Sequence, residues 1–329
     1  MIIYPGSASG GWESSIVNTL SAGDKILMFD SGFFAGNWRC IAEKFGIDVE
    51  IIECDWRVGV DANVVGKRLK QDSNHDIKSV MLVHNETSSG VTNPVLEVRE
   101  AIDAAGHPAL FMVDAVSSAG SIEYRQDDWR VDVTIAGSQK GLMLPPGMSF
   151  NLLSEKAIEA SKSATLPRSY WSWEDALPSM ETGFYPYTPA SVLFFGLQEA
   201  LLMMEEEGLE NIYARHARHA EATRRAVAAW GLENYCTIPE RSRDTVTTVL
   251  VPEDVSADAI RKVILERYDM SLGTGLGRLK DQVFRIGHIG SFSDLMLAGT
   301  LAGVEMGLAN AGVEHRPDGV AAALNYLKG

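Results

Sequence analysis

The first 140 residues alternate between short runs of β-branched and large apolar residues and longer stretches with a helical pattern. Strands that alternate with helices pair into parallel sheets, because each helix carries the chain back to the start of the next strand. We therefore predict an α/β fold in which helices cover a mostly parallel sheet. The predicted strands are residues 25–29, 49–53, 80–83, 109–113 and 133–136, and one predicted helix is residues 37–45.

Polar residues follow the ends of these predicted strands, which is where parallel sheets bind their ligands. Asp30, Asp114, Lys140 and residues 84–89 all hold such positions. Lys140 stands between a β-branched run and a turn rich in Gly and Pro. A lysine at the end of a buried strand loses solvation, which favours its neutral and nucleophilic amine.

Asp114 directly follows an apolar predicted strand. A carboxylate buried there without a partner is costly, and a cation would relieve that cost. Taken alone, Asp114 is also explained as a cap of the strand. Together with Lys140 it forms the pair that pyridoxal phosphate needs, a lysine for the Schiff base and an aspartate that keeps the pyridine nitrogen protonated. A nicotinamide dehydrogenase is the disfavoured alternative, because no GxGxxG segment follows the first predicted strand.

A loop of small residues near the N-terminus suits a phosphate group. The stretch Gly6-Ser-Ala-Ser-Gly-Gly11 precedes a predicted helix at residues 12–20. Small residues ahead of a helix let backbone N–H groups approach an anion, which the helix dipole also favours. The loop lacks the lysine of a nucleotide P-loop and the GxGxxG spacing, so we predict a site for a single phosphate. A plain Gly/Ser helix cap is the alternative.

Three other positions each have a functional and a structural interpretation. Thr87 lies in a dense polar loop and is placed near the phenolic oxygen of the cofactor, with His84 behind it; a turn with local caps is the alternative. Phe34 either belongs to the core or stacks on the pyridine ring. Arg285 lies inside an apolar strand, where it either binds a carboxylate or forms a structural ion pair.

A change of pattern after Gly231 predicts two domains, a large one over residues 1–231 and a smaller α/β domain over residues 232–329. A long helical pattern over residues 191–230 precedes the change. The elements predicted after it are a strand at 245–251, a helix at 257–267, a flexible turn with Gly273, Gly275 and Gly277, a strand at 283–286 and a helix at 293–309.

Composition narrows the class of partner. The formal net charge of −15 argues against nucleic acid and against an anionic membrane surface. Cys40, Cys54 and Cys236 are scattered, with neither a disulfide framework nor metal-ligand spacing. No signal-peptide pattern is found, and the longest apolar stretch, residues 190–204, is too short and too polar to span a bilayer. We predict a cytoplasmic protein without a metal.

With these residues in place, the chain resembles the fold-type I, class V aminotransferases, above all the serine–glyoxylate, aspartate–glyoxylate and alanine–glyoxylate group. Cysteine desulfurases share that fold, but they carry His where Gln139 precedes Lys140 here. The resemblance follows the family's order over nearly the whole chain. It rests on Gly6-Ser-Ala-Ser-Gly-Gly-Trp-Glu13, His84-Asn-Glu-Thr-Ser-Ser-Gly90, Val113-Asp-Ala-Val-Ser-Ser118, Gly137-Ser-Gln-Lys-Gly141, Tyr185-Pro-Tyr-Thr-Pro189 and Phe284-Arg-Ile-Gly-His288.

The resemblance implies a pyridoxal phosphate enzyme with the PLP-transferase type I fold. It implies a ping-pong transamination from L-serine or L-aspartate to glyoxylate, giving glycine plus hydroxypyruvate or oxaloacetate. A homodimer with shared active sites is also implied. Relatives carry further residues ahead of the position of Met1, so the alternative is a member that lacks this segment and has weak or no cofactor binding or activity.

The resemblance also assigns roles to individual residues. Lys140 is the expected Schiff-base lysine and Asp114 the partner of the pyridine nitrogen. Arg285 is expected to bind the substrate α-carboxylate, and Arg168 to meet a second carboxylate. The other implied cofactor contacts are Ser7, Ala8, Ser9 and Gln139 at the phosphate, Phe34 on the ring, Thr87 on its hydroxyl side, and Tyr185 and Thr188 at the phosphate of the neighbouring subunit's cofactor.

Overall fold

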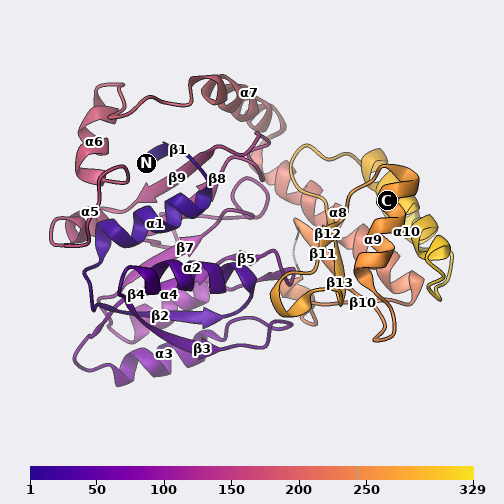
Figure 1. Cartoon of the computed structure of the whole chain (residues 1–329), viewed down its shortest axis with the longest axis horizontal. Coiled ribbons are helices and arrows are strands. Elements are labelled where there is room, and N and C mark those ends of the chain that lie inside the picture. The colour runs from indigo at the N-terminus through magenta and orange to yellow at the C-terminus, as the bar shows by residue number, and fades with distance from the viewer. Residues whose placement is uncertain (243) are drawn as a thin grey trace.

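The computed structural model describes residues 1–242 and 244–329. Its larger part is built on a seven-stranded sheet in the order β1-β9-β8-β7-β4-β2-β3 (Figure 1). The strands from β8 to β3 are parallel, whereas β9 is antiparallel to both of its neighbours. The predicted mostly parallel sheet is confirmed. Its strands are β1 (Ile2–Pro5), β2 (Lys25–Asp30), β3 (Asp48–Glu53), β4 (Ile77–Val83), β7 (Leu110–Asp114), β8 (Val133–Gly137) and β9 (Met148–Leu153).

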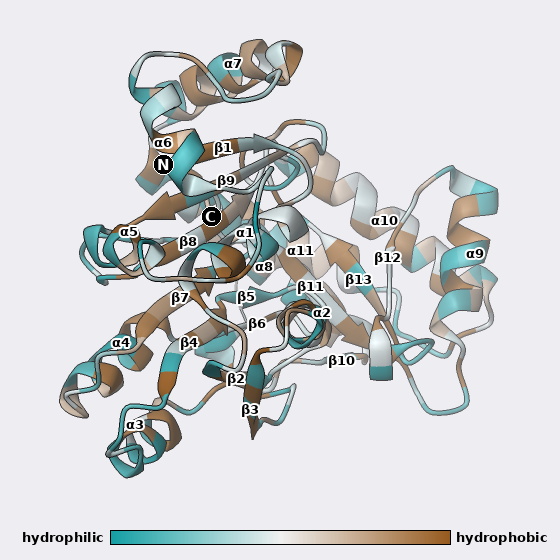
Figure 2. Ribbon diagram, turned by 60° about the vertical axis from the view of Figure 1, so that its left-hand side comes forward, coloured by the Kyte–Doolittle hydropathy of each residue, from teal (hydrophilic) through white to brown (hydrophobic). Residues whose placement is uncertain are grey.

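Helices cover both faces of this sheet. In β2, Ile26 and Met28 point into the core shared with α1 and α2, whereas Leu27 and Phe29 point into the core shared with α3 and α4. Apolar side chains on both faces are expected of a fully covered parallel strand. Figure 2 accordingly shows β7 in the hydrophobic colour and both colours on α3 and α4. These helices are α1 (Ala8–Thr19), α2 (Phe33–Lys44), α3 (Ala62–Gln71) and α4 (Val95–Ala104), with α5 (Glu155–Ser161) and α6 (Trp173–Glu181) further along the chain.

A pair of long helices leads to the C-terminal part (Figure 1). The sequence shows one long helical pattern over residues 191–230, but the structure divides it into α7 (Ser191–Glu207) and α8 (Leu209–Trp230). The break falls at Gly208, which has a φ of +81°. Glycine adopts this conformation without steric cost, so the chain turns there and starts a new helix.

The C-terminal part has its own antiparallel sheet, in the order β10-β11-β13-β12. Trp230, Ile264, Phe284 and Leu301 are buried in its core. Residues 222–230 of α8 contribute to this core, so the division at residue 231 stays a prediction. The elements are β10 (Glu233–Asn234), β11 (Val246–Leu250), β12 (Gly273–Thr274), β13 (Val283–Gly287), α9 (Ala257–Tyr268), α10 (Asp294–Asn310) and α11 (Gly319–Leu327).

Several short elements were not predicted from the sequence. Strands β1 and β9 extend the main sheet, and α11 packs against α8. The expected flexible turn at Gly273 begins instead with the edge strand β12, which pairs with β13. A small hairpin, β5 (Asn85–Glu86) and β6 (Val91–Thr92), follows β4 and carries the polar loop toward the end of the sheet.

Candidate active site

Two adjoining cavities lie at the carboxyl ends of the central strands. The inner one has a volume of about 170 Å³ and the outer one about 350 Å³, and Thr87, Ser117 and Lys140 line both. The structure thus brings most of the predicted residues to one place. The inner cavity is lined by Ser7, Ala8, Ser9, Trp12, Phe34, Val83, Asn85, Thr87, Asp114, Val116, Ser117, Gln139 and Lys140.

Lys140 follows β8 in a tight turn and reaches the junction of the two cavities. Burial lowers the pKa of its ammonium group, and the positive charge of Arg285 lowers it further. The charge of Asp114 acts in the opposite direction. Loss of solvation is therefore the main cause of the lowered pKa, as the sequence argument expects. It increases the share of Lys140 that is a neutral amine at a given pH.

Asp114 is the last residue of β7, and its carboxylate is buried. Its Oδ2 accepts a hydrogen bond of 3.0 Å from Trp12 Nε1, and its Oδ1 accepts one of 2.7 Å from the backbone N–H of Val116. Burial raises the pKa of Asp114 to about 7. No salt bridge to Asp114 is found within residues 1–242 and 244–329. A buried carboxylate without a cationic partner suits a protonated pyridine nitrogen.

The N-terminus of α1 also lines the inner cavity, through Ser7, Ala8 and Ser9. Ser7 is the N-cap residue, and its Oγ accepts a hydrogen bond from the backbone N–H of Ser9. The first turn of this twelve-residue helix carries no acidic side chain. A Cβ placed on Gly137 would lie 3.0 Å from Gln139 Oε1 and 3.2 Å from Ala8 Cβ, so Gln139 lies beside this helix end. The positive end of a helix dipole, without an acidic side chain beside it, fits a phosphate group here.

Phe34 reaches the inner cavity because α2 begins earlier than the sequence pattern indicates, at Phe33 instead of residue 37. The cause is Glu86, a fully buried residue of the polar loop. Its carboxylate accepts hydrogen bonds from the backbone N–H groups of Phe34 and Ala35, at 3.4 and 3.2 Å. A carboxylate at a helix N-terminus satisfies N–H groups that have no partner within the helix.

The neighbouring polar loop contributes Asn85 and Thr87 to the cavity, but not His84. Nδ1 of His84 lies 2.9 Å from Ser118 Oγ, and its ring packs against other aromatic rings. Asn85 donates hydrogen bonds to Ser117 Oγ and Thr245 Oγ1, at 2.9 and 2.8 Å. Sequence reasoning did not single out Asn85, although its place beside Thr87 after a strand was a usable signal.

Arg285 lies in the middle of β13 and lines the outer cavity. Its Nε donates to Thr274 O at 2.8 Å and its Nη1 donates to Thr87 O at 2.7 Å. It forms no salt bridge with any described residue, so the structural ion pair considered as an alternative is absent from this part of the chain. Carbonyl oxygens hold the guanidinium in place while its positive charge stays available to an anion.

Tyr185 and Thr188 line neither cavity of this chain. Tyr185 lies in a separate groove beside β1, and its ring packs against Phe194. Arg168 also lies away from the site. Its guanidinium donates to the carbonyl oxygens of Ala164, Val17 and Ser161, and its contact with a substrate carboxylate stays a prediction.

Two further features are absent from residues 1–242 and 244–329. No helix among them is long and apolar enough to cross a membrane. Likewise, no group of His, Cys, Asp or Glu side chains in this part of the chain is arranged to hold a metal ion.

A lysine and a buried aspartate at the strand ends of a mostly parallel sheet, beside a helix N-terminus, are the arrangement of a pyridoxal phosphate enzyme. The chain belongs to the class V aminotransferases, whose family model, aminotransferase class-V, matches residues 12–277. It is therefore an aminotransferase, and its cofactor is pyridoxal phosphate.

Relatives and solved structures agree with this assignment. The chain is 48% identical to a serine–glyoxylate aminotransferase of Methylorubrum extorquens, covering 100% of this chain and 83% of the relative. It is 43% identical to an L-aspartate–glyoxylate aminotransferase of Paracoccus denitrificans, with the same coverage of 100% and 83%. Its structure superposes on pyridoxamine–pyruvate aminotransferase of Mesorhizobium loti with a TM-score of 0.92 at 28% identity, covering 99% of this chain and 84% of that one.

Proposed function

We propose that this aminotransferase moves an amino group from L-serine or L-aspartate to glyoxylate, giving glycine plus hydroxypyruvate or oxaloacetate. The observation that carries the proposal is the cavity pair in which Lys140 faces Asp114 on the inner side and Arg285 on the outer side. An amine, a partner for a ring nitrogen and a receptor for a carboxylate would then surround one space. The names of the relatives support the two donors and the acceptor.

The residues around the inner cavity fit pyridoxal phosphate. The α1 N-terminus, with Ser7, Ala8 and Ser9, would bind the phosphate together with Gln139. Asp114 would hold the pyridine nitrogen protonated, because a cation relieves the cost of its burial. When bound, the cofactor supplies a carbonyl carbon that captures the amino group and a ring that accepts the electrons of the Cα–H bond. Phe34 would cover one face of that ring and Thr87 its hydroxyl side.

The protein's own contribution to the reaction is binding and proton transfer. Arg285 would bind the α-carboxylate of each substrate through N–H groups not used by Thr87 and Thr274. The neutral amine of Lys140 would take the proton from Cα of the donor and return one in the second half-reaction. Both half-reactions use the same residues, so the 2-oxo acid product leaves before glyoxylate enters.

Half-reactions test this proposal directly. Purified holoenzyme is mixed with L-serine, L-aspartate or L-alanine without an acceptor, and the cofactor absorbance is followed. We expect rapid conversion with L-serine or L-aspartate, reversed by glyoxylate with release of glycine. Borohydride treatment before substrate should fix the cofactor on the peptide that contains Lys140. A protein that converts neither L-serine nor L-aspartate, or that carries the reduced cofactor elsewhere, refutes the proposal.

We also propose a homodimer in which Tyr185 and Thr188 reach the cofactor phosphate of the neighbouring subunit. Helix α7, which follows these residues, exposes large apolar side chains, including Val192 and Phe195 at 80% and 75% exposure. Such a surface suits a partner. Mixing Lys140→Ala subunits with Tyr185→Ala subunits tests this arrangement, because one site of each hybrid dimer would regain both residues. Activity no higher than that of the two variants apart would exclude it.

A cytoplasmic location is proposed as well. The three cysteines, Cys40, Cys54 and Cys236, are all free thiols. Free thiols persist in reducing compartments. Fractionation of the source cells, with the protein followed by antibody, tests the location, and recovery outside the cytoplasm would refute it.

A further inference from the structure

The loop at residues 288–293, which joins β13 to α10, forms one wall of the outer cavity. Ile289 and Phe292 of this loop line the cavity together with Arg285. At its centre, Gly290 has a φ of +83°, and a Cβ placed on it would lie 3.4 Å from Met143 Cγ and 3.6 Å from Lys140 O. The loop therefore packs directly against the turn that carries Lys140.

Arg215 of α8 binds two carbonyl groups of this loop. Its Nη1 donates to Gly290 O at 2.8 Å and to Phe292 O at 3.3 Å. The other side of the guanidinium binds both carboxylate oxygens of Glu207, at 2.6 and 2.9 Å. Glu207 is the last residue of α7, so the contact also ties the break between α7 and α8 to the loop. A bidentate pair fixes the direction of the guanidinium.

His216, the next residue of α8, binds a backbone N–H group of the loop. Its Nδ1 lies 2.7 Å from Ile212 O, a carbonyl that can only accept, so Nδ1 carries the proton. Its Nε2 is then unprotonated and accepts a hydrogen bond of 3.0 Å from Gly290 N–H. The ring is fully buried, and burial lowers its pKa to about 4, in keeping with a neutral imidazole.

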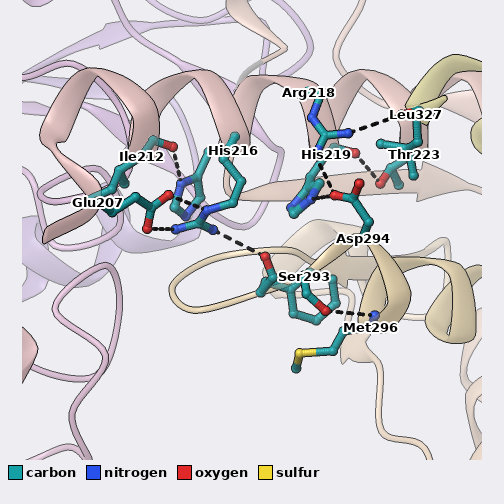
Figure 3. A network of polar contacts seen from close by, with 12 residues as sticks. Glu207, Ile212, His216, Arg218, His219, Thr223, Ser293, Asp294, Met296 and Leu327 are labelled. Atoms are coloured by element: carbon teal, nitrogen blue, oxygen red, sulfur yellow. Dashed lines mark hydrogen bonds and ion pairs between the residues drawn. The ribbon is translucent and has the colours of Figure 1, made fainter. Parts of the chain in front are cut away.

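Two consecutive residues of α8 thus bind both polar groups of Gly290. Figure 3 shows His216 on this helix with its hydrogen bond to Ile212 O. Neither Arg215 nor His216 lines the outer cavity, so neither touches a molecule bound there. Their neighbours on α8 continue the network: His219 and Arg218 both contact Asp294 at the start of α10, at 2.8 and 2.5 Å. The loop is therefore anchored to α8 at its centre and at its end.

We infer that Arg215 and His216 are positioning residues for the substrate side of the active site. They hold the Gly290 peptide against the Lys140 turn and so fix Ile289 and Phe292 beside Arg285. This inference rests on the proposed binding of the substrate carboxylate by Arg285. Their loss acts on substrate binding more than on cofactor binding, because the inner cavity is built from other segments.

Variants of His216 in the holoenzyme test the inference. His216→Leu removes the acceptor for Gly290 N–H, whereas His216→Gln keeps an amide oxygen near the position of Nε2. We expect His216→Leu to raise KM for the amino donor and for glyoxylate about tenfold, the usual effect of one lost buried hydrogen bond, with a smaller change in kcat. His216→Gln should restore most of the affinity. Cofactor absorbance should be that of the wild type in both variants.

Thr223→Val is the matched control. Thr223 is another fully buried polar residue of α8, and its Oγ1 donates to His219 O without reaching the loop. We expect this variant to keep the KM of the wild type even if its melting temperature falls. An equal rise of KM in Thr223→Val and His216→Leu would overturn the inference, since it would trace the effect to the stability of α8.

Arg215→Gln gives an independent measurement if His216→Leu does not fold. It removes the contacts to Gly290 O and Phe292 O and should raise KM in the same way. Wild-type KM in the folded His216→Leu variant, or in Arg215→Gln, overturns the positioning role. These results are separate from a failure of the proposed function: if the wild type uses a different amino donor, the same comparison of KM values is made with that donor.

Discussion

The indole Nε1 of Trp12 donates a hydrogen bond to Oδ2 of Asp114, and both residues line the inner cavity. This bond lowers the pKa of Asp114, whereas burial raises it to about 7. Asp114 must be ionised to pair with a protonated pyridine nitrogen. Trp12 therefore helps to keep the carboxylate charged near neutral pH, although it makes no ionic contact itself.

Trp12→Phe should weaken cofactor binding and make it more sensitive to acid. Without the indole donor, the pKa of Asp114 rises above about 7, so the carboxylate protonates at higher pH. We expect the Kd for pyridoxal phosphate to increase roughly tenfold, as for one lost hydrogen bond to a charged group. Titration of the apoenzyme with cofactor between pH 6 and 9, monitored by absorbance, measures both effects.

Trp38→Phe is the control for this experiment. Trp38 is fully buried and stacks on Trp12 with ring centroids 6.0 Å apart, but its Nε1 has no hydrogen-bond partner in the described structure. The same change of side chain there should leave the pH dependence of cofactor binding unaltered. If both variants shift it equally, packing of the indole and not its hydrogen bond controls Asp114.

Lys140→Ala should leave a folded protein with almost no transaminase activity. The variant loses the proton-transfer group, which typically contributes a factor of about 10²–10⁴, together with the covalent attachment of the cofactor. Single-turnover absorbance with L-serine measures the loss, and added ethylamine should restore part of the rate. Substantial turnover without an added amine would show that another group moves the proton.

Arg285→Lys should raise KM for both substrates with little change in the cofactor spectrum. Lysine is a point charge that cannot keep the contacts to Thr274 O and Thr87 O while presenting two N–H groups to a carboxylate. We expect an increase of about tenfold or more. Arg130→Lys, at an exposed ion pair with Asp103, is the control and should behave as the wild type. Unchanged KM in Arg285→Lys would show that another residue binds the substrate carboxylate.

The sequence predicts the parts of this fold that depend on local pattern. Strands β4 and β7 carry continuous apolar runs, and polar residues at or after the ends of β4, β7 and β8 line one cavity, as expected for parallel strands. Asp30, at the end of β2, instead accepts a hydrogen bond from Trp56 and lines neither cavity. Phe34 shows where local pattern fails. Helix α2 starts before its amphipathic stretch because Glu86, distant along the chain, binds its N-terminal N–H groups.

Long-range contacts also account for a residue that sequence reasoning missed and for the position of another outside the cavities. Trp12 binds Asp114 across 102 positions of sequence, which no local pattern encodes. Arg168 has the charge of a substrate-binding residue, but its guanidinium donates to main-chain carbonyl groups and lies outside both cavities of this chain. Type and spacing of residues therefore indicate which chemistry is present, while tertiary packing decides which side chains reach the cavity.

Glu86→Gln should destabilise the protein and weaken the support of Phe34. The carboxylate of Glu86 accepts from the backbone N–H groups of Phe34 and Ala35 and from both donors of Ser88. A glutamine amide replaces one acceptor oxygen with an NH₂ group that faces these donors. We expect the free energy of unfolding to fall by about 1–3 kcal/mol. Urea unfolding measures this value.

The exposed Glu100 provides the matched control, because Glu100→Gln makes the same chemical change at the surface of α4. Its free energy of unfolding should stay within about 0.5 kcal/mol of the wild type. A Glu86→Gln variant as stable as Glu100→Gln would mean that Glu86 is protonated in the folded protein and that α2 is held by packing alone.

Two buried histidines should make the protein sensitive to acid. Burial is the main cause that lowers the pKa of His216 from 6.5 to about 4 and that of His288 from 6.5 to about 3. Below pH 6.5 the unfolded chain binds protons that the folded chain does not, so the stability due to each neutral imidazole is full above pH 6.5 and declines as the pH falls toward the folded pKa. Each histidine contributes up to about 1.4 kcal/mol per pH unit to this decline.

Asp114 acts in the opposite direction, since its raised pKa makes the folded apoenzyme bind a proton more readily than the unfolded chain between its ordinary pKa and about 7. Asp114 is present in both the wild type and a His288 variant, so the difference between their free energies of unfolding removes its contribution. His288→Asn replaces a ring that contacts Asp244 O and Thr247 Oγ1. Urea unfolding at several pH values from 7 to 4.5 should give a shallower decline for this variant than for the wild type. Parallel curves would mean that His288 binds a proton as readily in the folded protein as in the unfolded chain, contrary to its burial.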